Sequence, residues 1–185
     1  MIKKMMQQKN YIKKMMFAAL FAALTAAVSP IKIPLGFTPV PITLQTLMVL
    51  LAGALLGANL GALSQFLYVL VGALGLPVFA GGGSGFGALF GPSGGYLFGF
   101  IAAAYVVGRL VEKAKKPSYI QLVIAMLVGS LVIYLFGVIG GLIATELPLA
   151  QILIGWVLPF IIGDVIKLVI AATIAYKSDI NKYIK

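Results

Sequence analysis

Two side chains of opposite charge, Asp164 and Lys167, lie within the otherwise apolar segment WVLPFIIGDVIKLVIAATIAY. A charge at membrane depth is costly and usually faces a protein interior or a polar cavity, so the pair indicates a functional site. Three residues apart on a helix, the two side chains project from nearly the same face. A carboxylate only accepts hydrogen bonds and an ammonium only donates them, so together they suit a ligand with adjacent N–H and C=O groups. The alternative is a structural ion pair that only neutralises itself.

Other polar and aromatic residues of the apolar segments are candidates for ligand contact. Gln45 and Gln65 could each contact a ligand, or only bond to backbone or to another helix. Tyr68 and Tyr96 could stack on a flat ligand, or only anchor helices at the membrane interface. Trp156 is expected in the outer belt of aromatic residues.

The composition restricts both the class of protein and its chemistry. Of the 185 residues, 62% are hydrophobic and 10% are charged. A soluble domain carries about 25% charged residues, so we expect an integral membrane protein. The chain has no histidine and no cysteine, which excludes disulfides, thiol or imidazole catalysis and nearly every metal site. No GxxxxGK[ST] segment occurs, so we expect no ATPase site in this chain. We also expect a protein that is not an enzyme and that has neither a cofactor nor a metal.

Six apolar segments can form transmembrane helices, since a hydrocarbon core of ~30 Å needs about 20 residues. They fall at residues 12–29, 41–57, 60–74, 95–111, 119–143 and 159–176. An even number of spans places both termini on one side of the membrane. The sequence therefore predicts an all-α bundle of six transmembrane helices, one substrate-binding domain over residues 1–185.

Basic residues gather at both termini and between the fourth and fifth spans. They are Lys3, Lys4, Lys9, Lys13, Lys14, Arg109, Lys113, Lys115, Lys116, Lys177, Lys182 and Lys185. Cytoplasmic segments of membrane proteins are enriched in Lys and Arg, so we expect both termini in the cytoplasm. Lysines beside anionic lipid headgroups also account for the net charge of +10 without a nucleic acid.

Three connections on the opposite side of the bundle are apolar and irregular. Residues 30–40 are rich in proline, residues 76–94 are rich in glycine, and residues 147–158 are too short to span, with Pro148 near a helix start. Backbone without helical structure persists at membrane depth only where it is buried or lines a cavity. We therefore expect the three loops to cap a pocket that opens outward.

Small residues recur along the first apolar segment at every fourth position, at Ala18, Ala22 and Ala26, with a second alanine after each. This spacing lets another helix approach closely. We interpret Ala18, Ala22 and Ala26 as a docking face for a partner protein, and the alternative is packing inside the bundle.

Four segments together resemble the BioY family, the biotin-binding membrane subunits (S components) of energy-coupling factor transporters. They are TPVPITLQTLMVLLAGALLG from Thr38, GLPVFAGG from Gly75, GPSGGYLFGF from Gly91 and GDVIK from Gly163. The resemblance covers nearly the whole chain in the expected order. At Ser93 the family usually has threonine, so a hydroxyl group is kept.

The resemblance implies a biotin pocket near the outer face of a six-helix bundle in a prokaryotic cell membrane. It also implies partners: a coupling transmembrane subunit, which docks on the small residues of the first helix, and two ATPase subunits. Asp164 would accept from a ureido N–H of biotin, and Lys167 would donate to the ureido oxygen. Tyr96 would cover the fused rings, and backbone N–H groups of the glycine-rich loop would meet the tail carboxylate.

Other classes of protein remain open from the residues alone. They are a stand-alone secondary transporter with Asp164 as a proton carrier, an intramembrane enzyme with a Ser–Lys site, and a structural subunit. Within the favoured class, an S component for another vitamin is the alternative.

Overall fold

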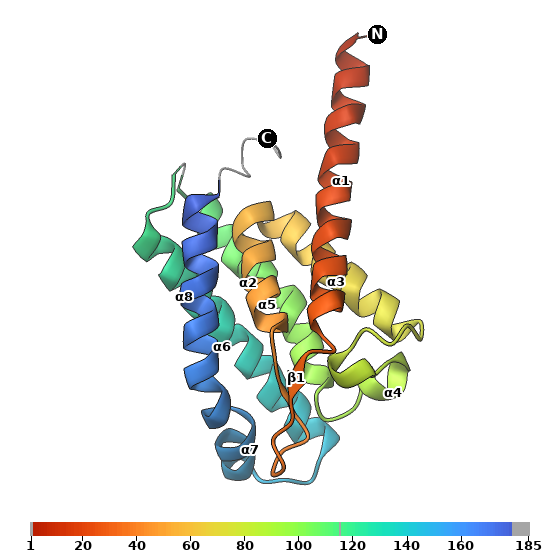
Figure 1. The fold of residues 1–185 in the computed structure, drawn as a ribbon, viewed down its shortest axis with the longest axis vertical. Coiled ribbons are helices and arrows are strands. Elements are labelled where there is room, and N and C mark those ends of the chain that lie inside the picture. The colour runs from red at the N-terminus through yellow and green to blue at the C-terminus, as the bar shows by residue number, and fades with distance from the viewer. Residues whose placement is uncertain (1, 115, 179–185) are drawn as a thin grey trace.

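The computed structural model describes residues 2–114 and 116–178, and its regular structure is almost entirely helical (Figure 1). The long helices are α1 (Ile2–Val28), α2 (Gln45–Leu56), α3 (Ala58–Ala73), α5 (Gly94–Glu112), α6 (Tyr119–Ala144) and α8 (Ile161–Lys177). The short elements are β1 (Lys32–Ile33), β2 (Ile42–Thr43), η1 (Ala80–Gly82), α4 (Gly85–Leu89), α7 (Leu149–Trp156) and η2 (Leu158–Phe160).

All six apolar segments of the sequence are helical, although their ends differ from the prediction. In the described part of the chain, four stretches are long and apolar enough to cross a membrane, and they include α1, α5, α6 and α7 to α8. Helices α2 and α3 have 12 and 16 residues, which is short for a full crossing. Helix α1 begins ten residues before the predicted span, because its polar first turns continue the helix beyond the apolar part.

The two ends of the bundle carry different structures (Figure 1). We call the end where α1 begins and α8 finishes the basic end. Exposed basic side chains surround it, at Lys9, Lys13, Arg109, Lys113, Lys116 and Lys177. The predicted basic residues Lys115, Lys182 and Lys185 lie outside the described residues, as do the side chains of Lys3 and Lys4.

The opposite end, which we call the capped end, holds the three connections that the sequence predicted as a cap. Strands β1 and β2 pair antiparallel, with Lys32 opposite Thr43. The glycine-rich connection forms η1 and α4, and Gly81 at its centre has a φ of 69°, a left-handed conformation that favours glycine. Helix α7 follows Pro148, as predicted.

Close helix packing depends on glycines that face one another. Helices α5 and α6 approach so closely that a Cβ at Gly140 would lie 2.5 Å from the Cα of Gly95. Small residues at such crossings let backbones make extensive van der Waals contact, which drives helix association in membranes. The start of α6 is fixed by a capping box between Ser118 and Gln121.

Trp156 corrects one prediction. Its side chain is 2% exposed and packs over Gly141, where an added Cβ would overlap the indole ring. The tryptophan therefore packs α7 onto α6 and does not belong to an aromatic belt at the membrane surface. The sequence alone did not reveal this, because α7 folds back onto the bundle.

The alanines of α1 point to two sides. Ala18 has no exposed surface, and Ala22 and Ala26 are half-buried against the core. Ala19, Ala23 and Ala27 are exposed. Ala18 therefore packs inside the bundle, which is the alternative that the sequence left open, and the exposed alanines are the second residue of each pair.

Candidate ligand-binding site

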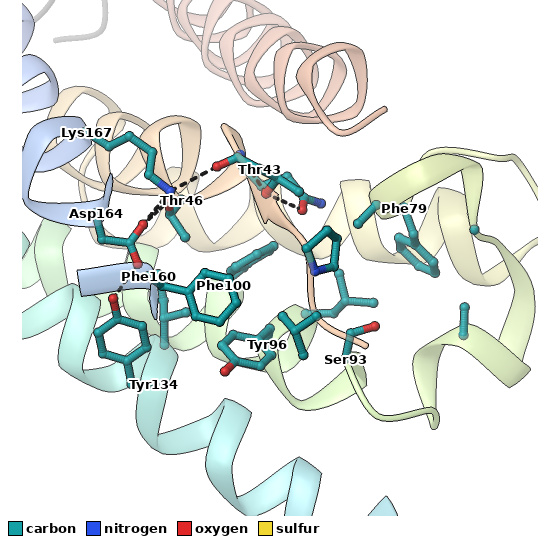
Figure 2. Close-up of a pocket in the computed structure, with 18 residues that line it drawn as sticks. Thr43, Thr46, Phe79, Ser93, Tyr96, Phe100, Tyr134, Phe160, Asp164 and Lys167 are labelled. Atoms are coloured by element: carbon teal, nitrogen blue, oxygen red, sulfur yellow. Dashed lines mark hydrogen bonds and ion pairs between the residues drawn. The ribbon is translucent and has the colours of Figure 1, made fainter. Parts of the chain in front are cut away.

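A cavity of about 90 Å³ lies at the capped end, between the long helices and the capping loops (Figure 2). Its wall is formed by Val40, Pro41, Thr43, Gln45, Thr46, Phe79, Ala80, Gly83, Ala88, Ser93, Tyr96, Leu97, Phe100, Ile133, Tyr134, Phe160, Asp164 and Lys167. Most of these side chains are apolar or aromatic, and a small number of polar side chains face the same cavity. Such a combination is typical of small-molecule sites.

Helix α8 places the two charges of the sequence at the cavity wall. Asp164 lies in its first turn, where the helix dipole favours a carboxylate, and Lys167 follows one turn later. Asp164 is 9% exposed and Lys167 is 7% exposed, and the Lys167 ammonium forms an ion pair with Asp164 Oδ1. The pair thus neutralises itself and also faces the cavity.

The Asp164 carboxylate is held by three donors from three other positions. Thr46 Oγ1 donates to Oδ1 at 3.1 Å, and the Tyr134 hydroxyl donates to Oδ2. Lys167 Nζ, besides its ion pair, donates to the carbonyl oxygen of Thr43 at 2.9 Å. These partners offset the cost of burying the two charges, since an unpaired buried charge is far more costly than a paired one.

Part of the hydrogen-bonding capacity of this pair is left over. An ammonium carries three N–H donors and a carboxylate has about four acceptor positions. Among the described residues, two of the three donors of Lys167 and one acceptor position of Asp164 Oδ2 are used. A donor and an acceptor therefore remain side by side for a ligand.

Gln45, the first residue of α2, supplies an amide to the same wall. Its Oε1 accepts from Thr43 Oγ1 at 2.8 Å, and its Nε2 donates to the Tyr68 hydroxyl at 2.5 Å. Tyr96 also lines the cavity, and its hydroxyl donates to the carbonyl oxygen of Trp156 at 2.6 Å. The ring of Tyr96 lies against Gly137, where a Cβ would overlap it, so this glycine fixes the ring position.

Figure 2 shows the cavity as an elongated site with different ends. Asp164 and Lys167 lie at one end, and Phe79 and Ser93 lie toward the other. Phe100 and Phe160 lie between them, and Tyr96 is beside Ser93. A ligand with a polar head and an apolar body matches this order.

Two predicted contact residues lie outside the wall. Tyr68 is 1% exposed and buried behind Gln45, whereas Gln65 has no exposed surface and donates to Thr25 Oγ1 at 3.3 Å and to Ser64 Oγ at 3.2 Å. Gln65 therefore bonds between α1 and α3, which is the alternative that the sequence left open.

The sequence reasoning missed Tyr134, Thr46 and the phenylalanines of the wall. Tyr134 and Ser130 are the residues with a hydroxyl in the middle of the apolar α6, and a hydroxyl at that depth was a usable signal for a polar partner. Thr46 directly follows Gln45 and shares its segment of polar residues. In the described residues no cluster of three or more His, Cys, Asp or Glu could hold a metal ion.

Comparison with known proteins places the chain in a family. The sequence pattern of the BioY family matches residues 3–182. The chain belongs to the BioY family. The biotin transporter BioY of Thermotoga maritima is 43% identical over 166 residues, which cover 90% of this chain and 95% of the relative. The probable biotin transporter BioY of Pyrococcus horikoshii is 40% identical over 163 residues, or 88% and 94% of the two chains.

A solved structure agrees with the BioY assignment at the level of the fold. The crystal structure of the S-component for biotin from an ECF-type ABC transporter superposes with a TM-score of 0.86 at 29% identity. The match covers 96% of this chain and 98% of that one. This BioY chain is therefore a multi-pass membrane protein with the fold of an S-component, and its relatives are named biotin transporters.

Proposed function

We propose that this chain captures biotin as the membrane-embedded substrate-binding subunit of an ECF-type ABC transporter. The observation that carries the proposal is the buried Asp164–Lys167 pair at the wall of an aromatic-lined cavity. The named biotin transporters among the relatives and the structural match to a biotin S-component support the same function.

The chemistry of biotin suits the two ends of the cavity. Its ureido ring has two N–H donors and a carbonyl acceptor, its fused rings are apolar, and its tail ends in a carboxylate. We place the ureido ring at the charged pair, where Asp164 accepts an N–H and Lys167 donates to the oxygen. The fused rings then lie between Tyr96, Phe100 and Phe160, and the tail extends toward the glycine-rich connection.

The cap also offers a cation to the tail. The side chain of Lys32 crosses Gly81 so closely that a Cβ there would overlap the ammonium group. Gly81 lies between Ala80 and Gly83, which line the cavity. Lys32 and the backbone N–H groups of this loop are therefore placed to attract a carboxylate at the mouth of the site.

A binding screen on the purified chain tests the substrate. Biotin, thiamine, riboflavin and folate are titrated into the protein in detergent by isothermal calorimetry. We expect binding of biotin alone, because only biotin combines a cyclic urea with a small apolar body. Binding of another vitamin in place of biotin, or of none, would contradict the proposal.

The proposed topology is a single domain of six transmembrane helices with both termini in the cytoplasm. The basic end then faces the cytoplasm, in agreement with the positive-inside rule, and the cavity opens outward. Because the sequence has no cysteine, single cysteines at Ser178 and Gly36 report their own side. In intact cells a membrane-impermeant thiol reagent should label Gly36→Cys and spare Ser178→Cys, and the reverse pattern would contradict this topology.

We propose that import requires a coupling transmembrane subunit and two ATPase subunits. The docking face on α1 is proposed at the exposed Ala19, Ala23 and Ala27, beside the inward-turned Ala22 and Ala26. In cells that supply these partners, Ala23→Trp should abolish biotin uptake and leave biotin binding unchanged. Loss of binding would mean that the face belongs to the bundle. Uptake by the lone chain that collapses with the proton gradient would instead indicate a secondary transporter.

A further inference from the structure

The phenol of Tyr68 connects the cavity wall to the cap although it does not line the cavity. Tyr68 lies on α3 and is 1% exposed. Its oxygen lies 2.5 Å from Gln45 Nε2, 3.0 Å from the carbonyl oxygen of Val78 and 3.4 Å from Ser29 Oγ. One hydroxyl thus joins the start of α2, the glycine-rich connection and the end of α1.

The single proton of this hydroxyl decides the direction of each bond. A carbonyl oxygen can only accept, so the Tyr68 proton goes to Val78. The phenol oxygen must then accept from Gln45, which requires the NH₂ group of the amide, and not its oxygen, on that side. The amide oxygen therefore faces Thr43, whose hydroxyl donates to it at 2.8 Å.

Of the two side chains bonded to the Gln45 amide, Tyr68 and Thr43, only Tyr68 can set the orientation of the amide. The Thr43 hydroxyl can donate or accept, so it would satisfy the Gln45 amide in either orientation. The two orientations of an amide have nearly the same shape, so only the hydrogen-bond network distinguishes them. With the Tyr68 proton committed to Val78, one orientation is satisfied and the other places two acceptors together.

We infer that Tyr68 is a positioning residue that fixes the Gln45 amide and thereby the donor and acceptor pattern that the cavity presents to its ligand. The inference rests on the proposed function. Gln45 Nε2 keeps a second N–H and Oε1 a second acceptor position, with no other partner among the described residues. A cyclic urea, with an acceptor oxygen beside N–H donors, complements an amide held in one orientation. A ligand with these groups exchanged does not.

The hydroxyl proton of Tyr68 also links the position of the cap to the orientation of the Gln45 amide. Val78 belongs to the glycine-rich connection, and its neighbour Phe79 packs edge-on against the Tyr68 ring, with ring centres 5.7 Å apart. If the connection moves away from Tyr68, the proton is freed and the Gln45 amide can turn. The closed cap and the recognition pattern of the cavity are therefore linked.

The test compares biotin with 2-iminobiotin, in which an N–H donor replaces the ureido oxygen. Dissociation constants of both ligands are measured by calorimetry for the wild type and for Tyr68→Phe. We expect Tyr68→Phe to weaken biotin binding about tenfold and to reduce the preference for biotin over 2-iminobiotin about fivefold or more, because the amide can then present either group. Tyr105→Phe, at an exposed position on α5, should leave both constants unchanged.

A second variant separates positioning from a loss of structure. Gln45→Leu has no amide, so it should lower the ligand preference on its own, and adding Tyr68→Phe to it should change the preference no further. An unchanged preference in Tyr68→Phe or in Gln45→Leu would overturn the inference, and so would equal weakening of both ligands. Absence of biotin binding in the wild type would instead contradict the proposed function.

Discussion

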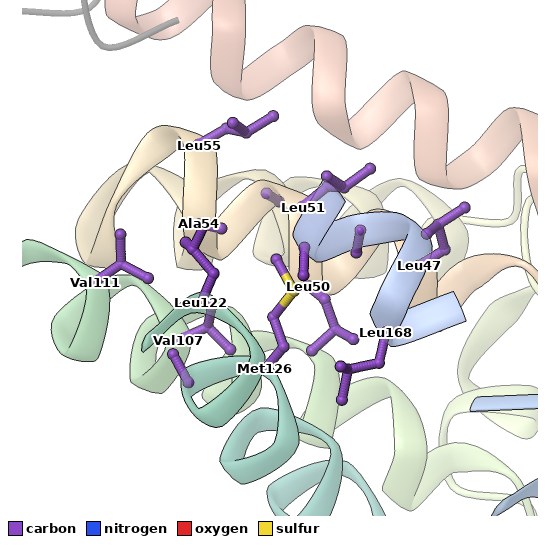
Figure 3. Close-up of a cluster of buried hydrophobic side chains, with 14 of the residues drawn as sticks. Leu47, Leu50, Leu51, Ala54, Leu55, Val107, Val111, Leu122, Met126 and Leu168 are labelled. Atoms are coloured by element: carbon purple, nitrogen blue, oxygen red, sulfur yellow. The ribbon is translucent and has the colours of Figure 1, made fainter. Parts of the chain in front are cut away.

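The half of the bundle next to the basic end and the half next to the capped end share α2, α5, α6 and α8 but bury different side chains. The first is filled by an apolar cluster in which Leu50 and Met126 are at most 1% exposed (Figure 3). The second contains the cavity and the charges of Asp164 and Lys167. The change occurs within one residue on α8, where Leu168 of the apolar cluster follows Lys167.

This contrast explains how the chain can hold a ligand in the cavity and still block its passage to the basic end. Between the charged pair and the basic end, a packed apolar cluster borders α1 and α6, and it includes Leu47, Leu50 and Leu168. Dense packing of this kind leaves no path for a molecule the size of a vitamin. We therefore propose that release toward the basic end requires the whole subunit to reorient against its partner subunits.

Within the half that contains the cavity, a large effect is expected from Lys167→Met. The substitution leaves Asp164 buried without its countercharge, and such losses cost about 2–5 kcal/mol in binding. The biotin dissociation constant should rise about 30-fold or more, as measured by calorimetry. Lys177→Met, on the exposed last turn of the same helix, is the control. Wild-type affinity in Lys167→Met would remove the lysine from the site.

In the half next to the basic end, the substitution to compare with Lys167→Met is Leu50→Ala. It should lower the free energy of unfolding by about 2 kcal/mol, near the small end of such changes, because lipid surroundings supply little hydrophobic transfer energy. Reversible unfolding in detergent measures this. The biotin affinity of the folded protein should stay within about threefold, and Leu131→Ala on the exposed face of α6 should change neither quantity. A large loss of affinity in Leu50→Ala would mean that the halves are not separate.

A smaller effect is expected from Tyr134→Phe, which removes one donor from the Asp164 carboxylate. Thr46 and Lys167 still hold the carboxylate, so the loss should be about 1.5 kcal/mol, or roughly tenfold in biotin affinity. Tyr119→Phe, at the start of the same helix, serves as the control. Equal affinities for Tyr134→Phe and the control would show that this hydroxyl only packs.

The smallest effect is expected from Lys32→Ala at the cap. Lys32 is exposed, so its attraction for the tail carboxylate should contribute at most about 1 kcal/mol, or two- to fivefold in affinity. The difference from wild type should shrink as salt is raised, because exposed charges are screened. Calorimetry at low and high ionic strength measures it, and a difference that does not depend on salt would contradict an electrostatic role.

The sequence predicted the helices well because an apolar segment of membrane length has few other ways to satisfy its backbone. It did not predict the start of α1, since hydropathy detects only the part of a helix that lies in lipid. The count of six spans stays a prediction, as α2 and α3 are short.

The site was predictable where a residue was conspicuous in an apolar segment, and less so where its direction mattered. Asp164, Lys167, Gln45 and Tyr96 line the cavity. Tyr68 does not, because its position along α3 was readable but its direction around the helix was not. The hydroxyl of Tyr134 was a signal for a polar partner, but α6 is apolar on every side, so the sequence did not show that Tyr134 faces the cavity.

The most direct test of the account is the biotin affinity of Asp164→Asn. The amide has the size of the carboxylate and can still accept from Thr46, but it leaves the Lys167 ammonium buried without a countercharge. Calorimetric titration of the purified variant should give a dissociation constant about 100-fold or more above that of the wild type, with Glu146→Gln, at an exposed position in the connection between α6 and α7, unchanged. An Asp164→Asn protein that folds and binds biotin within about threefold of the wild type would contradict the claim that this charged pair holds the ligand.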